Sequence, residues 1–131
     1  MTPMTIKPMT ASARTVFVFG LYLVVLGIGL LALPALVLAP FGLPAPMDVW
    51  ARVAGMVAAI LGVYYVLAAG HGLRAFFAWT VASRASVIVV FAVLVATGLG
   101  PAVLLVFGAV DLAGALWTWL ALKRDRASMA P

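Results

Sequence analysis

The chain has 131 residues, of which 67% are hydrophobic and only 8% are charged, with a net charge of +5. Soluble domains carry about 25% charged residues because their surfaces face water, so this composition excludes a soluble globular protein and predicts an integral membrane protein. The excess of basic residues fits the flanks of membrane spans, and no basic groove or aromatic platform predicts nucleic-acid binding.

The first predicted span runs over residues 15–39, after a tail of residues 1–13 that we expect to be disordered. This apolar run is much longer than the apolar region of a secretory signal, about 7–15 residues, so we expect a membrane span rather than a cleaved leader. Pro34 lies near the outer end of the run and predicts a kink or an early end of the helix there.

Three further spans are predicted over residues 49–69, 73–97 and 102–122, with a C-terminal tail over 127–131. Asp48 stands at the position of a helix N-cap before the second span. A hydrocarbon core of roughly 30 Å needs about 20 helical residues per crossing, so four spans use nearly the whole of residues 14–126. The sequence therefore predicts a single four-helix transmembrane domain, with no room for a soluble catalytic domain.

The positions of the basic residues predict the topology. If the N-terminus is inside, Arg52 is the one cation on the outer side and the other cations lie on the inner side. These inner cations are Lys7, Arg14, Arg74, Arg84, Lys123, Arg124 and Arg126. Cytoplasmic loops carry such an excess, so we predict an all-α, up-down-up-down four-helix bundle with both termini cytoplasmic. The bias toward Ala, Val, Gly and Arg indicates a bacterial genome, and hence a multi-pass protein of the inner membrane.

Asp111 is the most informative polar residue. It lies about ten residues into the fourth span, which at 1.5 Å per residue places it roughly 15 Å deep. A carboxylate at that depth costs at least about 2.5–3.5 kcal/mol and usually faces the bundle interior. Gly108 and Gly114 share its helix face and allow another helix to approach closely. We therefore predict that Asp111 points at another helix, in a buried polar cluster or a ligand site.

A tyrosine hydroxyl is the partner that we expect for Asp111. Tyr64 and Tyr65 lie near the inner third of the second span and lean toward the level of Asp111, and Tyr22 is another candidate. A direct ion pair between Arg84 and Asp111 is less favoured, because side chains tilt toward the N-terminus of their own helix and these two would lean apart.

The arginines near the span ends are candidate contacts for lipid headgroups. Arg84 is within reach of snorkelling to the interface, or binds an anionic headgroup together with Arg74 and hydrogen bonds from residues such as Thr80. Arg52 stands in the first turn of a helix, where the helix dipole disfavours a cation. We expect it to pair with Asp48, four residues earlier, or with a lipid phosphate.

Two stripes of small residues predict close helix packing. The residues of these stripes are Gly20 and Gly27 in the first span, and Ala51, Gly55, Ala59 and Gly62 in the second. Such stripes let helix backbones approach each other. The spacing leaves open whether they pack within one chain or between the chains of a homo-oligomer.

No catalytic or metal-binding constellation is apparent. Cysteine is absent and His71 is the single histidine, so a metal site lacks ligands. The sequence has no phosphate-binding glycine loop, no nucleophile elbow and no pair of carboxylates on one helix face. We therefore expect no cofactor and no enzymatic activity.

Three short patterns resemble the DoxX-like small four-helix membrane proteins of bacteria. They are Arg52-x-x-Gly55, Gly62-x-Tyr64-Tyr65 and Asp111-x-x-Gly114-Ala115. The resemblance implies the four-helix architecture and transfers no functional residue.

Two classes of function remain after these exclusions. The first is an accessory or structural protein that binds membrane lipids, a partner membrane protein or a second copy of itself. It predicts small-residue stripes buried between chains and no internal cavity. The second is a small binder or carrier of an apolar or proton-coupled ligand. It predicts a cavity that reaches Asp111 from one leaflet.

Overall fold

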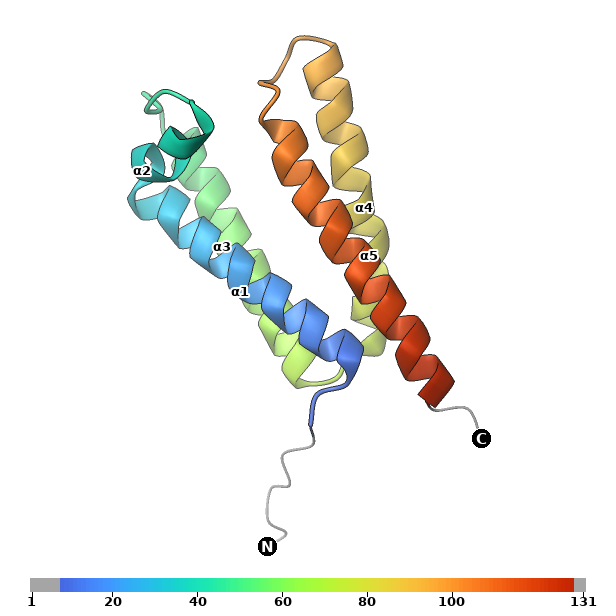
Figure 1. Cartoon of the computed structure of the whole chain (residues 1–131). Helices are drawn as coiled ribbons and strands as arrows, with labels where there is room; N and C mark the ends of the chain where they lie inside the picture. The colour runs from blue at the N-terminus through green and yellow to red at the C-terminus, as the bar shows by residue number, and fades with distance from the viewer. Residues whose placement is uncertain (1–7, 129–131) are drawn as a thin grey trace, which may run out of the picture.

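A computed structural model of the chain describes residues 8–128, and this part consists of helices and loops without a strand (Figure 1). The four long helices are α1 (Ala11–Ala32), α3 (Trp50–Gly70), α4 (Arg74–Ala96) and α5 (Leu104–Ser128). A short helix α2 (Pro34–Leu38) and a 3₁₀ turn η1 (Ala39–Phe41) follow α1. All four long helices are long and apolar enough to cross a membrane. The all-α prediction is confirmed, while Lys7 and most of the two predicted tails lie outside the described residues.

The first predicted span is divided between two helices. Helix α1 begins at Ala11, within the stretch expected to be disordered, because the hydroxyl of Thr10 accepts a hydrogen bond from the Ala13 amide at 3.2 Å. It ends at Ala32, and Pro34 occupies the first turn of α2, where a missing N–H is tolerated. At the other end of the chain, α5 continues to Ser128, beyond the predicted end at residue 122.

Glycines join α1 and α3 into one closely packed hairpin. A Cβ atom added to Gly27 would lie 2.4 Å from the carbonyl oxygen of Gly55, and one added to Gly62 would lie 2.7 Å from the carbonyl oxygen of Gly20. This register makes the two helices run in opposite directions. The small-residue stripes therefore pack within one chain, which answers the question that the sequence left open.

Helices α4 and α5 form the second hairpin. Gly108 of α5 packs closely against Ile88 of α4, and a Cβ atom added to Gly108 would lie 2.8 Å from the Ile88 side chain. The two hairpins meet mainly through α1, which contacts both α4 and α5. Figure 1 shows them close together at the end that holds the start of α1 and the end of α5, and diverging toward the other end. There the ring of Phe41 in η1 reaches that of Phe107 in α5, with centroids 5.0 Å apart.

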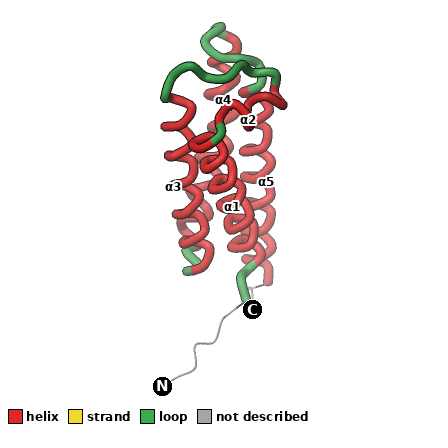
Figure 2. Tube along the Cα trace, turned by 90° about the vertical axis from the view of Figure 1, so that its left-hand side faces the viewer, coloured by secondary structure: helices red, strands yellow, loops and turns green. Residues whose placement is uncertain are grey.

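The buried core lies where the hairpins converge. Its apolar members are Ala13, Val16, Phe19, Leu23, Tyr65, Ala68, Ala69, Phe77 and Leu122. The four long helices run side by side along the length of the molecule (Figure 2), and most of their remaining apolar side chains are exposed. In a membrane protein these outer faces contact lipid, so the core needs to be only as wide as this junction.

Candidate functional site

Arg84 lies at the junction of the two hairpins and is only 3% exposed. Its guanidinium lies over the rings of Phe19 and Tyr65, 4.7 Å and 5.7 Å from their centroids. Cation–π contacts of this kind are strongest where the cation is shielded from water. The side chain is thus turned into the bundle and does not snorkel toward the interface, while the expected headgroup contact of Arg84 stays a prediction.

Threonines provide the hydrogen bonds of this buried cation. Nε of Arg84 donates to the carbonyl oxygen of Thr80 at 3.2 Å, and Nη2 donates to the hydroxyls of Thr80 and Thr118 at 3.0 and 2.7 Å. Nη1 is buried as well and has no acceptor among the described residues. A Cβ atom at Gly114 would lie 3.1 Å from Nη1 and 2.8 Å from the ring of Phe19, so this glycine makes the room for both.

A chain of hydrogen bonds continues from Arg84 to the end of the bundle. The hydroxyls of Thr118 and Thr15 share a bond of 2.8 Å, and Thr15 donates to the carbonyl oxygen of Ser12 at 2.7 Å. The hydroxyl of Ser12 donates to the Asp125 carboxylate, which also accepts from the amides of Ala11 and Ser12 at 3.2 Å. Asp125 of α5 therefore caps the first turn of α1 and ties the two hairpins together.

The predicted cluster around Asp111 is only partly formed. Asp111 is half-buried on the α5 face that was expected to point inward, and Leu105 and Leu112 on the opposite face are exposed. Within residues 8–128 it has no hydrogen bond to a tyrosine and no ion pair with Arg84. Its charge lies near enough to Arg84 for an electrostatic attraction.

The three candidate tyrosines have different surroundings. Tyr65 is 3% exposed and lies against Arg84, whereas Tyr64 is 59% exposed and faces out of the bundle. Tyr22 is half-buried, and its ring packs beside that of Phe19 with centroids 5.4 Å apart. None of Tyr64, Tyr65 and Tyr22 forms the expected hydrogen bond to Asp111 among the described residues, because Tyr64 points out of the bundle and Tyr65 lies against Arg84.

Arg52 stabilises the end of a helix. Its Nη1 donates to the carbonyl oxygen of Leu31 at 2.6 Å and lies 3.4 Å from that of Ala32, two of the carbonyls that a helix leaves without partners at its C-terminus. The expected pair with Asp48 is not formed. The carboxylate of Asp48 instead accepts from the Trp50 amide at 3.2 Å, at the start of α3.

Other expected sites are also defined by the structure. Arg74 is half-buried and its charge acts on Asp125. Nδ1 of His71 lies 2.8 Å from the carbonyl oxygen of Leu67, at the end of α3. Among residues 8–128, no three His, Asp or Glu side chains come together to hold a metal ion.

Two hollows of about 600 Å³ each lie along α1 and α2. Asp111 lines neither of them, so they are not the cavity at Asp111 that a carrier is expected to have.

Ser12, Thr15 and Asp125 form a part of the site that the sequence did not indicate. Thr118 lies on the same predicted inward face of the helix as Asp111 and Gly114. Its spacing could therefore have indicated that Thr118 belongs to the buried site. Ser12 lies in the stretch interpreted as a tail, where no helical spacing was considered.

The groups that this site offers are hydrogen-bond donors and acceptors around a buried cation. Arg84 is permanently charged and cannot act as a base, and the hydroxyls of Thr80 and Thr118 have no imidazole, amine or carboxylate within hydrogen-bond distance among the described residues. Nη1 carries two N–H groups that have no acceptor among the described residues. No protein-family model, no curated protein and no solved structure matches the chain, so its resemblance to the DoxX-like proteins stays a prediction.

Proposed function

We propose that the chain is a multi-pass protein of a bacterial inner membrane, with up-down-up-down topology and both termini in the cytoplasm. Four helices of sufficient length and hydropathy support this. The bond between Ser12 and Asp125 places the start of α1 and the end of α5 at one end of the bundle. The cations near that end, Arg14 and Arg124 among them, outnumber those near the other end, where Arg52 lies, as the cytoplasmic side requires.

The proposed role is that of an accessory protein which binds a lipid between its two hairpins, and not that of an enzyme. The observation that carries this proposal is Nη1 of Arg84, buried without an acceptor in the described part of the chain. An N–H group in this situation destabilises a fold by about 1–3 kcal/mol. A phosphate or carbonyl oxygen of a lipid would satisfy it, and Asp111 close by limits how much negative charge the ligand can bring.

The same role with a partner helix in place of a lipid has less support. A partner helix would need exposed stripes of small residues on which to pack. The stripes around Gly20 and Gly62 are already occupied by each other in the α1–α3 hairpin. Lipid binding therefore remains the better supported form of the accessory role.

Native mass spectrometry of the protein, released from membranes in a mild detergent, tests the lipid proposal. We expect the wild type to retain phospholipid and Arg84→Gln to lose it. Arg52→Gln removes an arginine at the opposite end of α1 and serves as the matched control, which should retain the lipid. Retention by Arg84→Gln at the wild-type level, or no retention by the wild type, would contradict the proposal.

A binder or carrier of a proton-coupled ligand is the second candidate. It is favoured by Asp111, a half-buried carboxylate in the first third of α5 that has no hydrogen bond to any other described residue. Carboxylates at such depth often take part in proton movement.

A further inference from the structure

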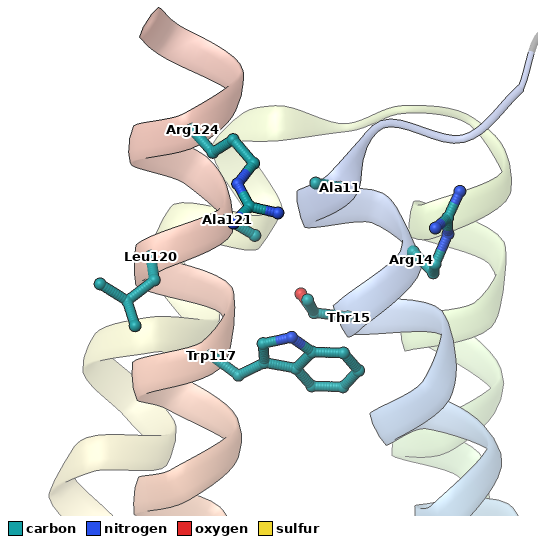
Figure 3. A pocket seen from close by; sticks show the side chains of 7 residues that line it. All are labelled: Ala11, Arg14, Thr15, Trp117, Leu120, Ala121 and Arg124. Carbon is teal, nitrogen blue, oxygen red and sulfur yellow. The ribbon is translucent and has the colours of Figure 1, made fainter.

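A further hollow lies at the converging end of the bundle. It has a volume of about 260 Å³ and lies between α1 and α5. Arg14 and Thr15 of α1 line it, together with Trp117, Leu120 and Arg124 of α5. We call it the arginine hollow. Figure 3 shows the Trp117 ring extending from α5 toward α1, with Arg124 on the α5 side of the hollow and Arg14 across α1 from it, its guanidinium turned away from Arg124.

The arginine hollow carries two positive charges that nothing in the described chain neutralises. Arg14 and Arg124 are both exposed, and neither forms an ion pair with a carboxylate of residues 8–128. The nearest acid in sequence is Asp125, and its oxygens are occupied by Ser12 and the first amides of α1. The α1 amides are therefore already satisfied, and the attraction for an anion comes from the two guanidinium groups.

The lining of the hollow changes from charged to apolar along α5. Arg124 lies at the mouth, whereas Leu120 and Trp117 are exposed apolar side chains one and two turns before it along α5. Tryptophan is enriched at the depth of lipid headgroups, and arginine forms bidentate hydrogen bonds with phosphate. A ligand that fits both the charged mouth and the apolar wall of the hollow has an anionic head and a hydrocarbon tail.

We propose that the arginine hollow binds the phosphate group of an anionic phospholipid from the leaflet that surrounds this end of the bundle. Arg124 binds the phosphate from α5, the exposed Arg14 side chain turns toward it from α1, and the acyl chains run over Trp117 and Leu120. The site rests on the proposed membrane topology, but it is separate from the lipid proposed at Arg84. It also gives the two hairpins a shared ligand at their junction.

Native mass spectrometry with lipid added in detergent tests this site. The protein is titrated with phosphatidylglycerol, with phosphatidylcholine and with inorganic phosphate. Two surface cations attract the charged headgroup of an anionic lipid, so we expect a preference for phosphatidylglycerol over phosphatidylcholine on the order of tenfold or more. The double variant Arg14→Gln/Arg124→Gln should lose this preference while its circular dichroism remains that of the wild type.

The matched control is Lys123→Gln/Arg126→Gln, which removes the same charge from the α4 side of α5. It should keep the preference. If both double variants lose the preference for phosphatidylglycerol equally, the preference comes from overall charge and the proposed site is wrong. The absence of a preference in the wild type would also overturn it. Competition by inorganic phosphate at the same concentration as the lipid would assign the hollow to free phosphate instead.

Single variants and Arg84→Gln complete the test. Should the Arg14→Gln/Arg124→Gln protein unfold, each single substitution must still reduce the preference. Arg84→Gln should release the lipid held between the hairpins without changing the preference for phosphatidylglycerol. The experiment thus distinguishes a failure of the proposed lipid site at Arg84 from a failure of the proposed site in the arginine hollow.

Discussion

Thr118 of α5 and Thr15 of α1 share a hydrogen bond of 2.8 Å at the junction of the two hairpins. The same Thr118 hydroxyl accepts a hydrogen bond from Arg84 at 2.7 Å. One hydroxyl therefore links three helices, α1, α4 and α5. The two hairpins are joined at this point by hydrogen bonds between buried side chains.

Thr118→Val removes this hydroxyl with little change of shape. We expect a loss of about 1–3 kcal/mol in the free energy of unfolding, because the buried Nη2 of Arg84 loses an acceptor. Unfolding in mixed detergent, followed by circular dichroism, measures the loss. Thr97→Val is the control, since Thr97 is exposed at the end of α4 and bonds only within its own helix. Equal effects of the two substitutions would show that the contact between helices contributes nothing.

Asp125→Ala should fray the start of α1. The carboxylate accepts from the Ala11 and Ser12 amides, and the loss of such a cap costs about 0.5–2 kcal/mol. Hydrogen exchange of the amides of Ala11, Ser12 and Ala13 should become faster, while those of α3 remain protected. Asp48→Ala is the control, because Asp48 bonds to the start of α3 and should leave α1 unchanged.

Gly27→Ala should destabilise the α1–α3 hairpin. The added Cβ would lie 2.4 Å from the amide nitrogen of Ala59, so the two backbones must separate, at a cost of about 1–3 kcal/mol. Gly70→Ala is the control, because a Cβ there meets no atom within 4 Å. Thermal unfolding of both variants in one detergent compares them. A Gly27→Ala protein as stable as Gly70→Ala would contradict the close packing.

The absence of cysteine makes the topology directly measurable. Single cysteines at Met47, His71 and Ala127, all exposed, can be labelled in intact cells with a reagent that does not cross the inner membrane. We expect Met47→Cys to react from outside, and His71→Cys and Ala127→Cys to react only after the cells are opened. Labelling of residues 71 and 127 from opposite sides would overturn the four-span topology.

Asp111→Leu should weaken folding or ligand binding more than Asp111→Asn does. Asparagine retains hydrogen-bonding groups on the inward face of α5, whereas leucine removes them. The free energy of unfolding and the lipid retained in native mass spectrometry are both measured. Wild-type behaviour of both variants would show that Asp111 has no part in stability or binding.

The four spans could be found from the sequence because long apolar runs are a local property of the chain. Helix ends were harder, since the start of α1 depends on Thr10 and on Asp125, which follows it by more than a hundred residues. The inward face of Asp111 followed from helical spacing. The burial of Arg84 did not, because it requires the rings of Phe19 and Tyr65, which come from the other hairpin.

The glycine contacts between α1 and α3 have a mechanical consequence. The backbones of these helices touch at Gly20 with Gly62 and at Gly27 with Gly55. Sliding one helix along the other would drive larger side chains into those gaps, so the pair moves as a single rod. We therefore expect a change in the shape of this protein to occur between the two hairpins, whose junction is held by hydrogen bonds between side chains, rather than within the α1–α3 pair.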